Sequence, residues 1–311
     1  MANDDLKKRL AALKAGKRDL GLLLEKPEPG KIGMSAQRLI TGKADPDYTS
    51  IKCTLEAAAQ RRSETPMEVY FVFDTTGSMR YVIEAVQKVI GYVGHQILQA
   101  EKGIAARVIG VGDHCDLSGI LKGIRTPAKL LGDYGQINDP TTDPRILESQ
   151  VKRIVYTHGG DDPEAYECLA HDLVALINED KSSFPEKKHA VVLFGDAYAQ
   201  QNRIMGVEDG CPNQRDAKQL IPLVSTSTRT FFVGCGGHFE ELTYGIVRDL
   251  QKAQYVPFNQ SRDVLPEALI GMVKLARHGA EGLQTYVTSL PKDTATKIMG
   301  LLSPGKGIEK T

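Results

Sequence analysis

Residues 69–79 read VYFVFDTTGSM, and this stretch decides the fold that we expect for the chain. Its first five residues are apolar and rich in β-branched and aromatic side chains, which is typical of a strand buried on both faces. The strand delivers Asp74 to a turn in which Thr76 and Ser78 follow on alternate positions, and Gly77 lets that turn bend without steric penalty. Apolar residues then recur at helical spacing, namely Val82, Ile83, Val86, Val89, Ile90 and Val93. The stretch therefore predicts a strand, a polar turn and a helix.

The side chains of Asp74, Thr76 and Ser78 predict a site for a hard divalent cation. Carboxylate and hydroxyl oxygens suit Mg²⁺ or Mn²⁺, whereas the turn lacks the Cys and His side chains that zinc and copper prefer. In open parallel sheets, ligands bind at the carboxyl ends of the strands, which is where this turn is expected. The alternative interpretation is that a Thr/Ser-rich turn only caps the next helix. The decision depends on whether distant parts of the chain supply further oxygen ligands.

Two later stretches complete a pattern that resembles the metal-ion-dependent adhesion site (MIDAS) of the von Willebrand factor A (vWA) family. Residues 74–78, DTTGS, match the family's D-x-[ST]-x-S element, and residues 190–196, AVVLFGD, match an apolar strand that ends in an aspartate. Residues 158–164, HGGDDPE, match the intervening element, but Asp161 stands where the family usually has threonine. This GGD variant is similar to vWA modules found beside atypical alpha-kinases and in some extracellular matrix proteins. The resemblance implies metal ligands at Asp74, Thr76, Ser78, Asp161 and Asp196.

The aspartate at position 161 has two consequences that differ from the usual pattern. A carboxylate in place of a hydroxyl adds negative charge, so the metal would be held more tightly without a partner. It also argues against a switch in which a threonine hydroxyl moves onto the metal. Alternatively, Asp161 and Asp162 cap the helix that Pro163 and Glu164 are expected to open.

With this resemblance, the apolar runs predict an α/β fold of the Rossmann-like doubly wound kind, with a mostly parallel six-stranded sheet and helices on both faces. The strands are expected at residues 69–73, 105–112, 118–127 (as an antiparallel edge strand), 190–196, 228–233 and 254–257. Helices are expected after residue 80, from residue 143, from residue 163, at residues 240–252 and at residues 264–278. The resemblance covers residues 65–278. Residues 1–64 are expected to form an N-terminal extension with one short helix and a turn-rich linker, and residues 279–311 a C-terminal helical extension and tail.

The composition argues against several function classes. The 39 basic and 39 acidic residues give no formal net charge, so we expect no nucleic-acid partner and no bulk affinity for anionic membranes. No apolar stretch approaches a membrane span, and the first residues lack the layout of a signal peptide.

Five scattered cysteines suggest reduced thiols in a cytoplasmic protein. Cys168 and His171 share a predicted helix face, but no second ligand pair has zinc spacing, so both are interpreted as packing residues.

The function we expect is that of a non-catalytic interaction module, whose Mg²⁺ (or Mn²⁺) takes an Asp or Glu side chain from a protein partner. The resemblance implies an AAA+ ATPase or another component of a multi-protein assembly as that partner. One alternative is a structural subunit of a defence or secretion complex, whose metal only rigidifies its loops. Another is a haloacid-dehalogenase-like phosphohydrolase with Asp74 as nucleophile, but Thr76 stands where those enzymes carry their second acid. The sequence also lacks a phosphate-binding G-x-x-x-x-G-K-[ST] loop and a G-x-S-x-G nucleophile elbow.

Overall fold

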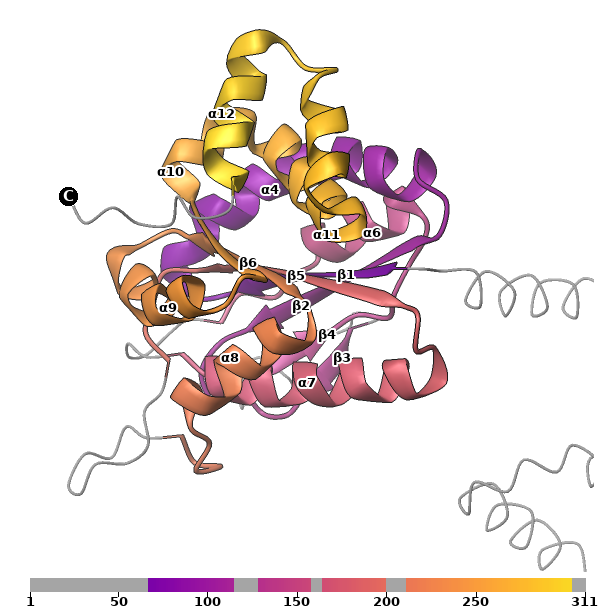
Figure 1. The fold of residues 1–311 in the computed structure, drawn as a ribbon. Helices are drawn as coiled ribbons and strands as arrows, with labels where there is room; N and C mark the ends of the chain where they lie inside the picture. The colour runs from indigo at the N-terminus through magenta and orange to yellow at the C-terminus, as the bar shows by residue number, and fades with distance from the viewer. Residues whose placement is uncertain (1–66, 115–127, 158–163, 200–210, 304–311) are drawn as a thin grey trace, which may run out of the picture. The chain divides into compact units, whose positions relative to one another are not determined.

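The computed structural model describes residues 67–114, 128–157, 164–199 and 211–303, which form a mixed α/β fold around one mostly parallel, seven-stranded sheet (Figure 1). All described residues belong to one compact unit, Arg61–Thr311. The strands are β1 (Met67–Asp74), β2 (Ile104–Val111), β3 (Lys129–Leu131), β4 (Gly135–Ile137), β5 (Lys188–Gly195), β6 (Arg229–Gly234) and β7 (Ala253–Pro257). Their order is β3-β4-β2-β1-β5-β6-β7, and only the β3–β4 hairpin runs antiparallel to its neighbours.

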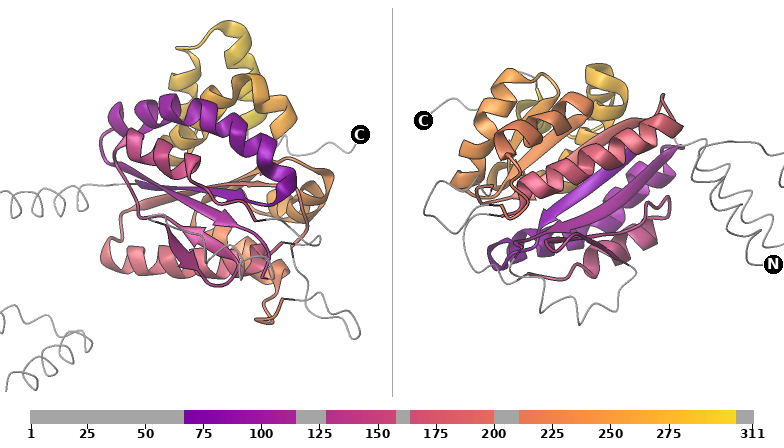
Figure 2. Two further views of the ribbon diagram at one scale, coloured as in Figure 1. Left: turned by 180° about the vertical axis from the view of Figure 1, so that it is seen from behind. Right: turned by 90° about the horizontal axis from the view of Figure 1, so that it is seen from below.

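Helices cover both faces of the sheet because its central strands are apolar on both sides (Figure 2). In β1, Val69, Phe71 and Phe73 belong to one core, while Tyr70 and Val72 belong to the other. The first core is closed by α4 (Arg80–Gly94), α6 (Pro144–Lys152), α11 (Leu265–Val287) and α12 (Lys292–Leu302), and the second by α7 (Tyr166–Ser183), α8 (Ala217–Ser227) and α9 (Gly237–Asp249). The short helix α10 (Phe258–Ser261) leads from β7 toward α11. Within the described segments, no helix is both long and apolar enough to span a membrane.

The predicted number of six strands is wrong, because the described residues form seven. The antiparallel edge strand expected at residues 118–127 falls outside the described segments, and the edge that is described is the β3–β4 hairpin. Each strand of that hairpin has only three residues, which is too short for a periodic signal. Its turn depends on Gly132, whose φ of +60° is the left-handed conformation that glycine adopts without cost. The helix expected from residue 143 is confirmed, since the Asp143 side chain caps α6 by accepting a hydrogen bond from Arg145 N at 2.9 Å.

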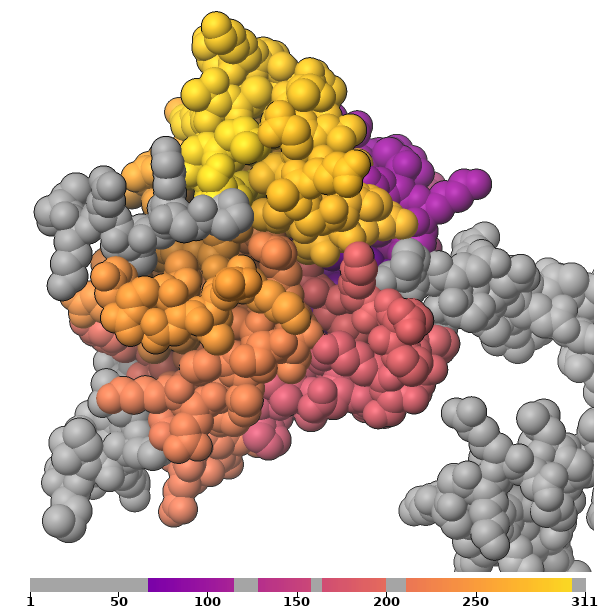
Figure 3. Space-filling view, in the orientation of Figure 1, coloured from indigo at the N-terminus to yellow at the C-terminus, as the bar shows by residue number. Residues whose placement is uncertain are grey.

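The C-terminal helices pack on the hydrophobic core. Helix α11 continues past residue 278 to Val287, across a kink at Gly279 where φ is +71°. Helix α12 then inserts Ile298 and Leu302 into the first core, where both side chains are fully buried. In the space-filling view of Figure 3, these helices, in gold and yellow, lie against the orange and indigo parts of the surface. The segment interpreted from sequence as an extension therefore contributes directly to the core.

This packing predicts that truncating Ile298 destabilises the fold. Ile298→Ala should lower the free energy of unfolding by about 2–5 kcal/mol, because it removes buried methyl groups and leaves a cavity. The matched control is Gly300→Ala on the same helix, where an added Cβ meets nothing within 4 Å. That substitution should leave stability unchanged or raise it by about 1 kcal/mol. The free energy of unfolding of both variants is measured by urea denaturation. Equal values for the two variants would mean that α12 does not pack as described.

Candidate metal centre

Two neighbouring parallel strands bring Asp74 and Asp196 to the carboxyl edge of the sheet. Asp74 is the last residue of β1, and Asp196 follows directly after β5. The register pairs Phe73 with Phe194, so strands β1 and β5 end at the same level of the sheet. The carboxylates lie close enough that the charge of Asp196 raises the pKa of Asp74. The sheet thus places side by side two aspartates that are far apart in the sequence.

The Asp74 carboxylate is completely buried and held by three hydrogen bonds. Its Oδ1 atom accepts from the backbone N–H of Thr76 at 2.9 Å and from the Thr76 hydroxyl at 2.6 Å. Its Oδ2 atom accepts a hydrogen bond at 2.6 Å from the phenolic O–H of Tyr166, which is the first residue of α7. These bonds stabilise the ionised form, but burial outweighs them and, with the neighbouring Asp196, raises the pKa of Asp74 to about 7. A divalent cation nearby would favour the ionised carboxylate.

The hydroxyl groups of Thr76 and Ser78 form a hydrogen-bonded series that runs from the Asp74 carboxylate to the solvent. The Oγ1 atom of Thr76 lies 3.2 Å from Oγ of Ser78, and Ser78 is exposed whereas Thr76 is buried. Adjacent ligands of an octahedral Mg²⁺ ion stand about 3 Å apart, given metal–oxygen distances of about 2.1 Å. Since the Thr76 hydroxyl points its proton at Asp74, its lone pairs remain available to a cation. The donor set and this spacing fit a small hard cation whose outer side faces solvent.

The surrounding backbone holds the turn from two sides. Thr75 donates through its hydroxyl to Val111 O at 2.9 Å, and its own carbonyl accepts from Thr157 N at 2.9 Å. On the other side, Gly236 packs so closely that a Cβ there would lie 2.9 Å from Asp196 O. A side chain at that position would therefore push Asp196 out of place.

Of the five residues predicted as ligands, the structure brings Asp74, Thr76 and Ser78 together and puts Asp196 beside them. Asp161 lies outside the described residues, so its role stays a prediction. The described residues on either side of it reach this edge of the sheet, because Thr157 N bonds to Thr75 O and Ala165 N donates to Gly112 O at 3.2 Å.

Sequence reasoning missed Tyr166, the residue that binds the second oxygen of Asp74. It is the first residue of α7, and a tyrosine at that position carries no motif of its own. Asp113, two residues after β2, accepts a hydrogen bond from His114 N at 2.5 Å. The ring of His114 faces Cys168, with Nε2 at 3.3 Å from Sγ.

Tyr166 should stabilise the buried carboxylate, and Tyr166→Phe tests this. In metal-free protein the substitution should lower the free energy of unfolding by about 1–3 kcal/mol, because it leaves a buried acceptor short of one donor. Tyr81→Phe is the matched control: its O–H bonds Cys235 O at 3.2 Å, but the residue is 44% exposed and water can replace the bond. It should cost less than about 1 kcal/mol. Equal costs for the two substitutions in thermal or urea unfolding would contradict the role given to Tyr166.

No family model and no curated protein matches this chain. Among solved structures, it is similar to the pilus adhesin SpaC from Lactobacillus rhamnosus GG, with 11% identity, a TM-score of 0.46, and coverage of 68% of this chain and 30% of the adhesin. It is also similar to proximal thread matrix protein 1 from the mussel byssus, with 14% identity, a TM-score of 0.42, and coverage of 68% and 48%. The chain thus spans less than half the length of these proteins. Likenesses this weak carry no argument about metal, partner or activity.

Proposed function

We propose that this chain is a non-catalytic interaction module that binds Mg²⁺ (or Mn²⁺) and uses the ion to hold a carboxylate of a protein partner. One observation carries the proposal: the buried Asp74 carboxylate lies beside Asp196 and leads through two hydroxyl groups to the surface. The bound ion would supply a positive centre with a coordination position open to an Asp or Glu oxygen. The architecture proposed for the module is the Rossmann-like doubly wound one.

The proposed ligands have two roles: the aspartates supply negative charge, and the hydroxyl groups supply neutral oxygen ligands on the side that faces a partner. Asp74 supplies negative charge at the buried base of the site, with the half-buried Asp196 beside it. The hydroxyl oxygen of Thr76 lies inside the site and that of Ser78 at its mouth. Asp161 is proposed to complete the set, directly or through water. Because the charge at the base is fixed by buried hydrogen bonds, the ion would be positioned before a partner arrives.

The class of partner follows from the chemistry of the open position. A magnesium ion prefers a hard anionic oxygen, so an acidic side chain on a protein surface fits better than a neutral one. The vWA-like pattern suggests an AAA+ ATPase or another component of an assembly, and the loops around the site would set which acidic group can approach.

A phosphohydrolase that uses Asp74 is disfavoured by the position of that residue. A nucleophile must reach its substrate, but Asp74 is fully buried and both of its oxygens accept hydrogen bonds. A structural subunit with a purely stabilising metal has the same geometry as our proposal. It differs in one outcome, since such a metal would affect melting and leave partner binding unchanged.

Metal binding is tested by titrating full-length protein with Mn²⁺ and following the signal of the free ion by electron paramagnetic resonance. Asp74→Ala and Asp196→Ala should each weaken one Mn²⁺ site by at least about tenfold. Asp263→Ala is the control, because that side chain is 82% exposed and pairs only weakly with Lys297 at 3.3 Å. Unchanged Mn²⁺ affinity in both site variants would refute the site.

The role of the metal is tested by capturing partners from a lysate of the source organism with immobilised wild-type protein. Proteins retained by the wild type should be released by EDTA, return with added Mg²⁺, and be absent with Asp74→Ala. Partners that stay bound under chelation, while the melting temperature falls, would establish the structural-metal alternative. Metal-dependent turnover of a phosphate ester that is lost in Asp74→Ala would establish the hydrolase.

A further inference from the structure

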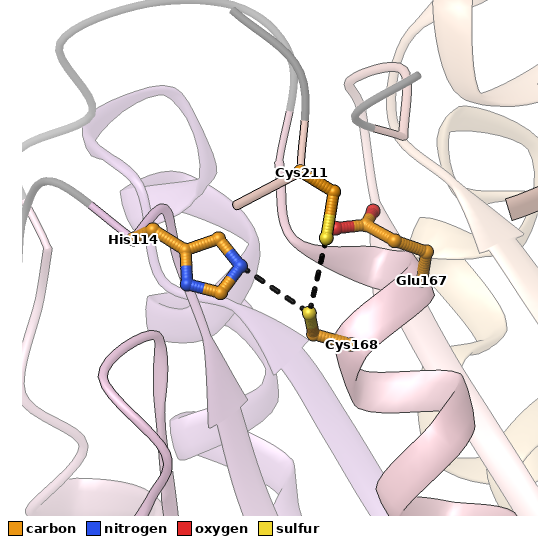
Figure 4. Close-up of side chains that lie close together, drawn as sticks. All are labelled: His114, Glu167, Cys168 and Cys211. Atoms are coloured by element: carbon orange, nitrogen blue, oxygen red, sulfur yellow. Dashed lines mark hydrogen bonds between the residues drawn. The ribbon is translucent and has the colours of Figure 1, made fainter. Parts of the chain in front are cut away.

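A second cluster of metal-ligating side chains lies apart from the candidate magnesium site. It consists of His114, just after β2, Glu167 and Cys168, in the first turn of α7, and Cys211, ahead of α8 (Figure 4). One ligand atom from each residue lies within 4.8 Å of all the others. Cys168 Sγ is central, at 3.3 Å from His114 Nε2 and 3.5 Å from Cys211 Sγ.

These separations are close to the edges of a zinc coordination tetrahedron. With Zn–S of about 2.3 Å and Zn–N of about 2.0 Å, tetrahedral ligands stand about 3.8 Å apart for two sulfurs and about 3.5 Å apart for sulfur and nitrogen. Small side-chain movements would therefore be enough to admit the ion. The set also has the right chemistry, because thiolate and imidazole ligands select zinc over magnesium or calcium.

The Glu167 carboxylate provides a second, independent indication of a cation. Its side chain is fully buried, and no donor of normal hydrogen-bond geometry in the described part of the chain reaches either oxygen. The thiols of Cys211 and Cys168 are weak donors that approach it. A buried carboxylate with no stronger donors is costly unless a proton or a cation accompanies it. Figure 4 shows it turned toward the sulfur atoms of the cluster, where a metal ion would meet it.

Outer groups orient two of the four ligands. The Nδ1 atom of His114 lies 2.6 Å from Asp133 Oδ1, which leaves Nε2 facing Cys168. A carboxylate on the far nitrogen of a histidine is the usual support for a zinc-bound imidazole, because it fixes the tautomer and the ring orientation. The amide of Asn213 donates to Cys168 Sγ at 3.4 Å, as expected beside a thiolate.

We propose that this cluster is a zinc site, in which Cys168, Cys211, His114 and Glu167 supply the four ligands of a tetrahedral Zn²⁺ ion. Four protein ligands leave no position for a substrate, so the ion is structural. It joins the end of β2, the first turn of α7 and the segment that leads into α8. This inference does not rest on the proposed function of the first site.

Of the two residues expected to be packing residues, Cys168 is buried in the second core and on this proposal also binds the metal, whereas His171 is exposed. His171 lies on the exposed side of α7 and pairs with Asp172 at 2.8 Å, away from the cluster. Cys168 instead meets residues from two other segments, which no spacing rule could connect. The competing interpretation of the two cysteines is a disulfide, although the sulfurs are 3.5 Å apart rather than the bonded distance of about 2.05 Å.

The test is the zinc content of the full-length protein, purified under reducing conditions without chelators and measured by inductively coupled plasma mass spectrometry. We expect about one zinc per chain in the wild type. Cys168→Ser and Cys211→Ser should lose it, whereas Cys235→Ser, a cysteine outside the cluster, should keep it. Asp74→Ala should also keep its zinc, which separates this site from the first one.

A cobalt-substituted wild-type protein makes the test independent of how the serine variants fold. Tetrahedral Co²⁺ with two thiolates should give a thiolate-to-metal charge-transfer band and intense visible bands, and Glu167→Gln should shift the visible bands. Reduced protein that takes up neither Zn²⁺ nor Co²⁺ would overturn the proposal. So would a mass spectrum showing Cys168 and Cys211 joined as a disulfide in freshly prepared protein, or equal zinc loss in Cys235→Ser.

Discussion

The structure around the candidate metal centre depends on one constraint, the burial of the Asp74 carboxylate at the end of the central strand. A charged group removed from water must be compensated by hydrogen bonds, a proton or a cation. Thr76 and Tyr166 supply the hydrogen bonds, but burial and the nearby charge of Asp196 still raise the pKa of Asp74 to about 7. Either a proton or a cation can supply the remaining compensation, and on the proposed function it is a divalent ion, which suits the oxygen atoms of this turn.

The sheet explains why that charge is found at this edge. All eight residues of β1 are buried, because the strand has parallel neighbours on both sides and helices on both faces. Backbone groups inside the sheet bond one another, so the first freely adjustable polar groups occur where the strands end. In parallel strands these ends coincide, and Asp74 and Asp196 meet without any local sequence relation between them.

Much of the fold could be predicted, since long apolar runs such as those of β1 and β5 have few alternatives to a buried strand. The β3–β4 hairpin was not predictable in the same way, because its strands are too short to show a period. Helix α8 was missed as well: Pro222 lies inside it and interrupts the helical pattern.

The two candidate sites also differ in how far they could be predicted from the sequence. Asp74, Thr76 and Ser78 are close in sequence, so their convergence is visible as a motif. The contacts of Tyr166 with Asp74, and of Cys168 with Cys211 and His114, exist only after folding. The sequence indicates a shared helix face for Cys168 and His171, but the histidine that Cys168 contacts is His114. Proximity along α7 does not tell which side of the helix faces the protein.

The first turn of α7 connects the two sites. Tyr166 donates to Asp74, and the next two residues, Glu167 and Cys168, belong to the sulfur-containing cluster. Successive residues of a helix point about 100° apart, so one turn can contact two sites on different sides. On the proposed assignments, the donor sets would keep the ions distinct, because oxygen ligands favour magnesium and thiolates favour zinc. On the proposed assignments, a zinc ion that holds this turn also holds the Tyr166 hydroxyl against the carboxylate on which the first site depends.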